Sequence, residues 1–240
     1  MANFPTYTAR LVRSTALSER TKHLEFEVRG ESRFGFVAGQ WLSVKHQMPD
    51  GKHLIRAYSV ASAPSGNSHF AFCINRVQDG FMSNFLCDMQ PGDEIPCQGP
   101  FGSFILRPPL RDTLFIATGT GIAPIRSMLH WLLADESRCE NKQFWLLFGN
   151  RTEGDIYYHE EFLQLAEKHP NIHYLPTLSR GDPAWRGLRG YVQDHVQGLV
   201  GDRNDMQAYI CGLAKMVKVN RDLLAGMGWD RKAIMYERYD

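Results

Sequence analysis

The period of the apolar residues changes near the middle of this chain, and that change constrains the fold more than any other feature. Up to about residue 107, apolar and polar residues alternate in short segments separated by Gly, Pro, Asn and Asp, which is typical of antiparallel strands joined by turns. A first domain with an antiparallel β-barrel is therefore predicted, with strands at 8–13, 23–28, 41–45, 55–60 and 69–74 and one short helix at about 83–89.

The second half alternates short apolar runs with amphipathic segments. This alternation favours an α/β domain in which helices cover a parallel sheet. Strands are expected at 114–117, 144–148, 172–175, 208–210 and 233–236, and helices at 125–133, 160–167, 191–196 and 215–224. Two adjacent prolines, Pro108 and Pro109, interrupt both patterns, so we place a first domain at 1–108 and a second at 109–240.

Composition limits the classes of partner. With 240 residues, 43% of them hydrophobic, the chain can bury two cores of ordinary size. A net charge of +1 gives no signal for nucleic acid or an anionic membrane. No apolar run reaches the roughly 20 residues that span a bilayer, and the first ten residues lack the pattern of a secretory signal. We expect a cytoplasmic monomer with neither nucleic acid nor membrane as a partner.

The cysteines argue against metal centres. There are five, an odd number, and their wide spacing disfavours a disulfide framework, a zinc site or an iron–sulfur cluster within this chain. They are Cys73, Cys87, Cys97, Cys139 and Cys211. We therefore expect no metal, and an iron–sulfur protein that exchanges electrons with this chain must be a separate molecule.

Arg56-Ala57-Tyr58-Ser59 combines a cation, a phenol and a hydroxyl on one predicted strand. Alternate side chains of a strand point to opposite faces, so Arg56 and Tyr58 share one face while Ala57 and Ser59 share the other. A long planar cofactor with a phosphate could lie along such a strand. The same residues also fit an ordinary half-buried strand.

Thr118-Gly119-Thr120-Gly121 follows the apolar run 114–117 and precedes a helical pattern. A strand, a glycine turn and a helix together present backbone N–H groups to a phosphate, although many α/β proteins use such turns for packing alone. Pro124 stands where a full dinucleotide fingerprint would have a third glycine. Cys211-Gly212 ends a second strand in the same way before another helix.

Six motifs follow one another along the chain, and in this order and spacing they resemble the ferredoxin–NADP reductase superfamily over nearly its whole length. The resemblance implies a flavin-binding antiparallel barrel followed by a domain that binds a nicotinamide nucleotide. The motifs are Arg56-x-Tyr58-Ser59, Gly80-Phe81-Met82-Ser83, Gly99-Pro100-Phe101-Gly102, Gly119-Thr120-Gly121-Ile122-Ala123-Pro124, Cys211-Gly212 and Glu237-x-Tyr239.

For the barrel, the resemblance implies that the 56–59 motif, Ala57 included, binds FAD. Arg56 would bind its phosphate, Tyr58 would stack on the isoalloxazine and the Ser59 hydroxyl would lie beside N5. A second phosphate contact is implied at Gly80, Met82 and Ser83. The choice of FAD over FMN rests on the resemblance, because the residues by themselves do not distinguish the two cofactors.

For the second domain, the resemblance implies that Thr118, Gly119, Thr120 and Gly121 lie under the pyrophosphate of the nucleotide. Cys211 and Gly212 would abut the nicotinamide, with Cys211 acting by shape and polarity and not as a nucleophile. Glu237 would lie by the reacting centre and Tyr239 over the flavin. Relatives of the plant type end at that tyrosine, whereas this chain carries one further residue, Asp240.

The choice of nucleotide depends on three arginines. Arg151, Arg180 and Arg189 resemble positions that contact the 2′-phosphate end in bacterial members that use NADPH, which favours NADPH. Asp182, two residues beyond Arg180, keeps NADH open because a carboxylate can bind a ribose 2′-hydroxyl.

The function implied is electron transport by a flavoprotein oxidoreductase of the ferredoxin reductase type. A hydride would pass between NAD(P)H and bound FAD, and single electrons would pass to or from a ferredoxin, a flavodoxin or an oxygenase on a separate chain. Two alternatives remain open at this point. One is an NAD(P)H-dependent reductase of free flavin or quinone, and the other is a non-enzymatic flavin-binding interaction subunit.

Overall fold

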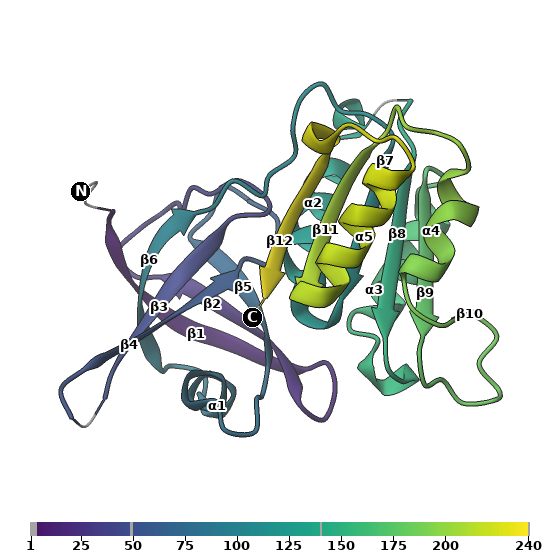
Figure 1. The fold of residues 1–240 in the computed structure, drawn as a ribbon. Helices are drawn as coiled ribbons and strands as arrows, with labels where there is room; N and C mark the ends of the chain where they lie inside the picture. Colours follow the sequence, from purple (N-terminus) through teal and green to yellow (C-terminus); the bar gives the residue numbers. More distant parts are fainter. Residues whose placement is uncertain (1–3, 49, 140, 240) are drawn as a thin grey trace. The chain divides into compact units, whose positions relative to one another are not determined.

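The computed structural model describes residues 4–48, 50–139 and 141–239. Contacts divide the chain into two units (Figure 1). One comprises the residues up to Ile105 together with Arg126–Ala134, and the other comprises Leu106–Ile125 and the residues from Asp135 onward. The domain limit predicted after residue 108 lies close to this division and stays a prediction.

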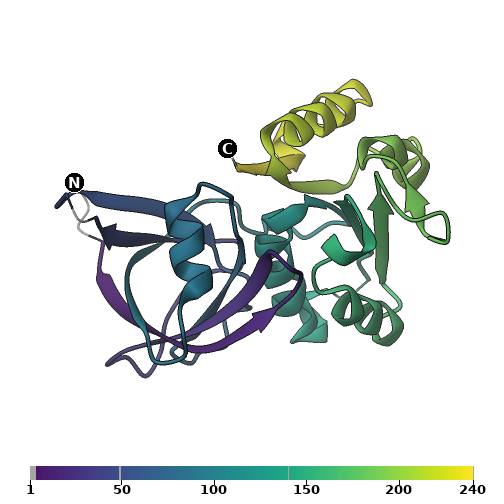
Figure 2. The ribbon, with the colours of Figure 1, turned by 90° about the horizontal axis from the view of Figure 1, so that it is seen from below.

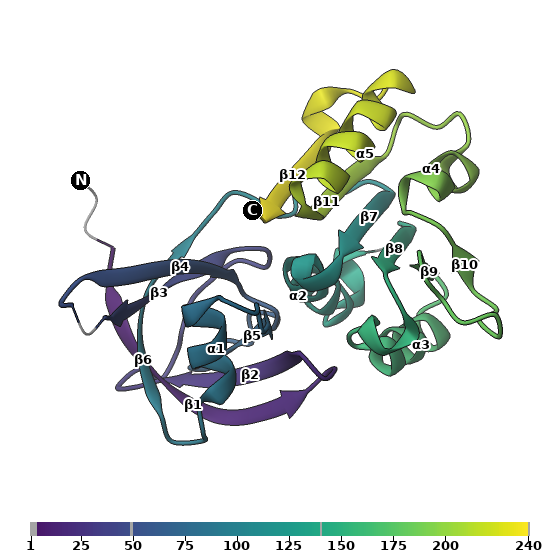
Figure 3. The same cartoon turned by 60° about the horizontal axis from the view of Figure 1, so that its bottom comes forward.

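The first unit is an antiparallel six-stranded sheet that curls into a barrel, in the order β4-β3-β6-β1-β2-β5. A bridge between Val60 and Phe72 joins the two edges of the sheet. The short helix α1 (Phe81–Asp88) covers one end (Figure 3). The strands are β1 (Thr6–Ala16), β2 (Thr21–Val28), β3 (Trp41–Gln47), β4 (His53–Ser59), β5 (His69–Asn75) and β6 (Glu94–Phe101).

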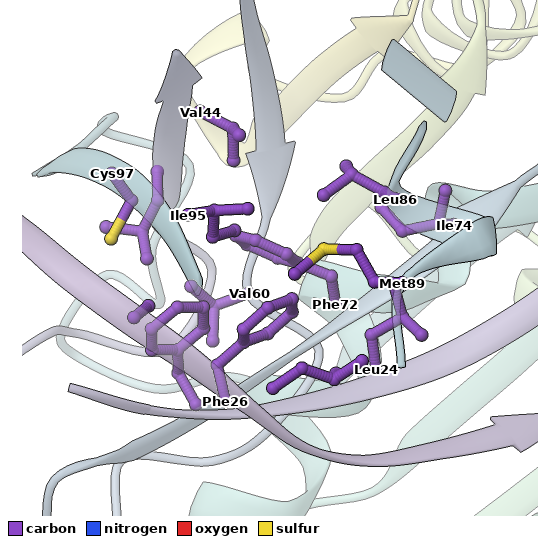
Figure 4. Packing of buried hydrophobic residues seen from close by; sticks show 14 of the residues in the cluster. Leu24, Phe26, Val44, Val60, Phe72, Ile74, Leu86, Met89, Ile95 and Cys97 are labelled. Carbon is purple, nitrogen blue, oxygen red and sulfur yellow. The ribbon is translucent and has the colours of Figure 1, made fainter. Parts of the chain in front are cut away.

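Apolar residues that alternate with polar ones along the strands form the barrel core. In β2, Leu24, Phe26 and Val28 are at most 1% exposed, while the residues between them are only partly covered. Figure 4 shows Phe26 and Phe72 packed together with Leu86 and Met89 from α1 and its C-terminal end. Burying each such side chain stabilises the fold by roughly 1.5–3 kcal/mol. This core therefore holds the strands of the barrel in fixed positions.

The second unit is a six-stranded parallel sheet in the order β10-β9-β8-β7-β11-β12. Helix α3 covers one face and α4 and α5 cover the other (Figure 2). The strands are β7 (Thr113–Thr118), β8 (Phe144–Asn150), β9 (Ile172–Leu178), β10 (Leu188–Arg189), β11 (Gln207–Leu213) and β12 (Ile234–Tyr239). The helices of this unit are α3 (His159–Lys168), α4 (Gln193–Val200) and α5 (Ala214–Gly226). Helix α2 (Ile122–Leu133) begins in this unit, and from Arg126 onward it belongs to the first unit.

The central strands of this sheet are apolar without alternation because both of their faces are covered. Leu114, Phe115, Ile116 and Ala117 are all 0% exposed. Such continuous apolar runs are typical of parallel strands between two helical layers. The predicted fold class, an antiparallel barrel followed by a parallel α/β domain, is confirmed.

The segment that enters the second unit is fastened to β11. The backbone N–H of Arg107 donates to the Tyr209 hydroxyl at 2.8 Å, and Gln207 Nε2 donates to the carbonyl oxygens of Arg107 and Pro109. Arg203 adds a 2.8 Å ion pair with Asp112. The chain from 107 to 112 is therefore held near the start of β11 by hydrogen bonds and an ion pair.

Several details differ from the predictions, among them two strands and the start of one helix. Strand β6 was not predicted, because Pro96, Gly99 and Pro100 break the alternating pattern, yet it lies between β3 and β1. The two-residue strand β10 was also missed. Helix α1 begins at Phe81 with Gly80 as its N-cap, two residues before the predicted start at Ser83. None of the helices in the described ranges has the length and apolar character needed to cross a bilayer.

Candidate flavin and nucleotide sites

The 56–59 motif lies on β4, an edge strand of the barrel sheet. Arg56 is exposed, and its Nη1 donates to the neighbouring carbonyl oxygen of Ile55 at 2.8 Å. Tyr58 is half-buried, its ring centroid 5.6 Å from that of Phe72, and burial raises the pKa of Tyr58 to about 12. Ser59 is 6% exposed. The strand thus presents an accessible guanidinium and a phenol that stays protonated at neutral pH.

A second set of donors lies at the start of α1. The Ser83 hydroxyl accepts from the N–H of Val77 at 3.1 Å and donates to the Gly80 carbonyl at 3.0 Å. A Cβ at Gly80 would lie 2.7 Å from Ser83 Oγ, so the turn requires a glycine. Ser83 therefore shapes this turn, and the first backbone N–H groups of the helix are left without intrahelical acceptors.

The turn and the motif strand lie on the same side of the barrel. His46 on β3 pairs in register with Leu54 on β4, two residues from Arg56. The His46 ring also contacts Phe81, the first residue of α1, with centroids 5.0 Å apart. A guanidinium and the N–H groups of a helix start are the donors that a pyrophosphate accepts. The donor set fits the phosphates of a flavin nucleotide.

In the second unit, the 118–121 motif forms a turn between β7 and α2. Gly119 has φ +55°, and a Cβ there would meet no atom within 4 Å, so its surface is open. Gly121 instead packs against the backbone of Cys211 and Gly212 so closely that a Cβ would overlap the Cys211 carbonyl oxygen. Gly212, with φ +147°, likewise leaves no room for a Cβ beside the Thr118 hydroxyl.

These residues meet at a point where the strand order reverses. From β7 the sheet continues to β8 on one side and to β11 on the other, and all three strands are parallel. Ligands of open α/β sheets bind outside the carboxyl ends of the strands at such a point. Thr118 Oγ1 is buried there with no hydrogen-bond partner among the described residues. The unpartnered Thr118 hydroxyl and the glycine turn beside it fit a bound nucleotide.

The C-terminal strand adds to the same sheet edge. In the parallel pair β11–β12, Cys211 lies opposite Glu237 and Leu213 opposite Tyr239. Burial raises the pKa of the Cys211 thiol well above its ordinary value; the Glu237 carboxylate acts in the same direction, and a hydrogen bond with Tyr239 opposes both. Cys211 is therefore a neutral thiol at physiological pH, unsuited to nucleophilic attack. Asp240 lies outside the described residues.

The three predicted arginines have different surroundings. Loops after β8 and β9 run side by side, joined by a 2.8 Å hydrogen bond from the Arg180 N–H to the Arg151 carbonyl. Both side chains are exposed. The Arg189 guanidinium instead donates to four carbonyl oxygens of its own loop, those of Gly181, Asp182, Pro183 and Trp185. Arg151 and Arg180 are thus available to an anion, whereas Arg189 is engaged.

One candidate site residue was not predicted from the sequence. Tyr191, just beyond β10, is 64% exposed, although a tyrosine normally hides much of its ring. Its backbone is fixed by a 2.8 Å bond from its N–H to Asp194 Oδ2. Its position two residues after Arg189 could have identified it. The prediction of a helix at 191–196 concealed this signal, because it placed Tyr191 in the helix.

Within the described residues, no group of His, Cys, Asp and Glu could hold a metal ion. Cys73, Cys87, Cys97, Cys139 and Cys211 are all buried and unbridged.

Comparison with known proteins assigns both halves of the chain. Residues 8–105 match an oxidoreductase FAD-binding domain and residues 115–222 an oxidoreductase NAD-binding domain. The chain is 41% identical to ferredoxin–NADP reductase B of Sorangium cellulosum, and the match covers 98% of each protein.

Other relatives are longer than this chain. The reductase component of phenol 2-monooxygenase from Pseudomonas is 32% identical over 85% of this chain, which spans only 58% of that protein. The crystal structure of an Amycolatopsis cytochrome P450 reductase superposes with a TM-score of 0.86 at 23% identity, covering 99% of this chain and 71% of that one. The latter similarity supports the fold.

Fold, site and comparisons define a two-domain oxidoreductase that combines an FAD-binding barrel with an NAD-binding α/β domain. The chain belongs to the ferredoxin–NADP reductase family. The predictions of an enzyme, of FAD and of a nicotinamide nucleotide are confirmed, and the non-enzymatic alternative is excluded.

Proposed function

We propose that this flavoprotein carries electrons between NADPH and a separate protein, a ferredoxin, a flavodoxin or an oxygenase component. The observation that carries the proposal is the match to a ferredoxin–NADP reductase over 98% of both chains. A relative named as the reductase component of a phenol monooxygenase supports an oxygenase as a second type of acceptor. The domains proposed for this task are residues 1–108 and 109–240.

When bound, FAD accepts a hydride from the nicotinamide nucleotide and releases electrons one at a time. We assign the flavin phosphates to Arg56 and to the turn of Gly80, Met82 and Ser83. Tyr58 would cover one face of the flavin ring and exclude water from it. The Ser59 hydroxyl can both donate and accept a hydrogen bond, so it can serve N5 in either oxidation state. Ala57 completes the strand without filling the space of the cofactor.

We assign the nucleotide to the carboxyl edge of the parallel sheet. Gly119, Thr120 and Gly121 would bind its pyrophosphate through backbone N–H groups, and the orphaned Thr118 hydroxyl would gain a partner there. Cys211 and Gly212 would orient the nicotinamide. Glu237 and Tyr239, from the neighbouring strand, would bound the same space and fix where the reacting carbon lies.

We propose NADPH as the preferred nucleotide. Arg151 and Arg180 are exposed on adjoining loops, and two guanidinium groups suit a 2′-phosphate. Arg189 would act indirectly, by holding the loop on which Arg180 lies. Asp182 engages its own loop, since its Oδ1 accepts from the N–H of Ala184 at 2.8 Å, which weakens the case for a ribose-binding carboxylate and NADH.

The acceptor is tested by steady-state kinetics of the full chain with NADPH. Reduction of a ferredoxin or flavodoxin should exceed reduction of free FMN or of a quinone in kcat/KM, and it should fall with rising salt if charged patches guide docking. Turnover of the small molecules alone would support the free-flavin or quinone reductase instead.

We further propose that the protein acts as a monomer in the cytoplasm. Five unbridged, buried cysteines support a reducing compartment. Light scattering during size-exclusion chromatography tests the monomer, whose mass is 27.4 kDa.

A further inference from the structure

Helix α2 passes from one unit into the other along its length. It begins at Ile122, directly after the glycine turn, and from Arg126 onward it belongs to the unit of the barrel. Residues 126–134 lie within the part of the sequence that matches an NAD-binding domain, yet they pack in the unit that matches an FAD-binding domain. The flavin unit is therefore completed by residues from the second half of the sequence.

Two side chains of this part of α2 bond to the segment that follows Ser59. Arg126 Nη1 donates to the carbonyl oxygen of Ala61 at 2.8 Å, and the Ser127 hydroxyl donates to the carbonyl oxygen of Ser62 at 2.6 Å. Ser127 is 0% exposed. Because a buried carbonyl without a donor costs free energy, these two bonds hold the segment against the helix.

The other bonds of this segment run to β5. The N–H of Ala61 donates to the carbonyl oxygen of Ala71 at 2.7 Å, and the N–H of Ala71 donates to the Ser62 hydroxyl at 3.0 Å. The segment thus has β5 on one side and α2 on the other. Without the bonds from α2 it would be held from one side only.

Helix α2 also contacts the turn that comes before β3. A Cβ at Gly39 would lie 2.5 Å from Met128 Cε, so the helix and this turn are packed directly against each other. The carbonyl oxygen of the next residue, Gln40, accepts from the N–H of Val60 at 2.9 Å. Val60 directly follows Ser59, so α2 supports the backbone beside Ser59 through a second route.

These contacts act on a side chain that has little freedom of its own. Ser59 is 6% exposed, and one torsion angle separates its hydroxyl from the backbone, so the hydroxyl moves with the backbone. We propose that Arg126 and Ser127 are positioning residues that fix the Ser59 hydroxyl where it meets the flavin, an inference that rests on the proposed function. A displacement of about 1 Å near the reacting atoms can cost about 100-fold in rate.

The test uses the full chain loaded with FAD and follows reduction of the flavin by NADPH in single turnovers. Ser127→Ala should slow reduction by about 5- to 100-fold, as expected for a displacement of up to about 1 Å. The apparent Kd for NADPH should stay unchanged, because the glycine turn is not altered. Hydrogen exchange gives a readout independent of activity: loss of one hydrogen bond should speed exchange of the Ala61 N–H by about 5-fold.

Arg126 supplies a second variant. Arg126→Ala should also slow reduction, and Arg126→Lys should restore most of the rate, because an ammonium can still donate to the Ala61 carbonyl. A double-mutant cycle with Ser59→Ala separates positioning from packing. If α2 acts through the Ser59 hydroxyl, Ser127→Ala should change the rate of the Ser59→Ala protein by no more than about 2-fold, the scatter found for independent sites.

Ser137→Ala and Arg138→Ala are the matched controls. Both side chains contact Asp135, beyond the end of α2: the Ser137 hydroxyl donates to Asp135 Oδ1 at 2.7 Å, and Arg138 pairs with the same carboxylate at 3.5 Å. Neither control should change the rate of flavin reduction or the exchange of the Ala61 N–H.

Two results would overturn the positioning role while leaving the proposed function intact. One is an unchanged rate in both Ser127→Ala and Arg126→Ala, and the other is equal slowing with and without the Ser59 hydroxyl. If Ser127→Ala did not fold, Arg126→Ala and Arg126→Lys would decide between positioning and packing in the same cycle. A wild-type flavin that NADPH does not reduce would instead refute the proposed function.

Discussion

Gly121 packs against the backbone of Cys211 with no room for a side chain between them. A Cβ at position 121 would overlap the Cys211 carbonyl oxygen and lie 2.8 Å from Cα of Gly212. The glycine turn after β7 thereby touches the end of β11, and the two strands that flank the reversal of strand order are held in direct contact.

Gly121→Ala should therefore destabilise the fold by about 1 to 3 kcal/mol, the usual cost of overpacking, and should raise the KM for the nucleotide by separating the two strand ends. Urea unfolding and steady-state kinetics measure the two effects. Gly198→Ala is the control: Gly198 lies in α4, where an added Cβ would meet no atom within 4 Å, so alanine should add about 0.5–1 kcal/mol of stability. Similar behaviour of the two variants would contradict the steric argument.

Arg56→Ala should lower flavin affinity by about 10- to 100-fold, because charged hydrogen bonds to a phosphate contribute roughly 1.5–3 kcal/mol each. Its effect on unfolding should stay within about 0.5 kcal/mol, since the side chain is exposed and bonds only to its neighbour's carbonyl in the described residues. Flavin released on dilution is measured by fluorescence. Arg33→Ala, an exposed arginine of the same unit, should release none; a fully yellow Arg56→Ala protein would rule out the phosphate role.

Arg180→Ala should raise the KM for NADPH by about 10- to 100-fold, from the loss of a charged contact, and should leave the KM for NADH nearly unchanged. Arg189→Ala should raise both, because it frees the four loop carbonyls that this guanidinium binds. Initial rates with the two nucleotides separate these outcomes. If Arg180→Ala weakened both nucleotides equally, its role would be structural.

Alkaline pH should destabilise the protein. Burial raises the pKa of Cys97 from 9.0 to about 12, and those of Tyr58 and Tyr209 from 10.0 to about 12. Below about pH 8 both states keep these protons, so no pH dependence arises from them. Between about pH 9 and 12 the unfolded chain loses protons that the folded chain retains, and the free energy of unfolding falls by about 1.4 kcal/mol per group for each unit between its two pKa values.

Urea unfolding at about pH 8 and about pH 10.5 tests this slope. Cys97→Ala should reduce the difference between the two pH values, because it removes the group with the widest gap. Equal stability at both pH values in the wild-type chain would contradict the assignment.

The fold was predictable because its two halves carry different periods. Alternation identified β2, and the fully apolar run 114–117 identified a strand covered on both faces. Strand β6 could not be found this way, since Pro96, Gly99 and Pro100 remove the alternation; its neighbours β3 and β1 supply the pairing that its own sequence does not indicate.

The site was only partly predictable. Motifs identified the glycine turns, because close backbone contacts such as that of Gly121 with Cys211 admit no other residue. They could not distinguish Arg189, bound to its own loop, from exposed Arg180, because that difference depends on a loop conformation set by tertiary contacts.

The hydrogen bonds of Arg107, Gln207 and Tyr209 have a practical consequence for dissecting the protein. A nucleotide-binding fragment that begins at Leu106 would keep the segment bonded to β11, and with it the hydrogen-bond partners of the Gln207 and Tyr209 side chains. One that begins at Asp112 would strip the Tyr209 hydroxyl of its donor and the Gln207 amide of its acceptors, so shortening the fragment by six residues should make it harder to produce in folded form.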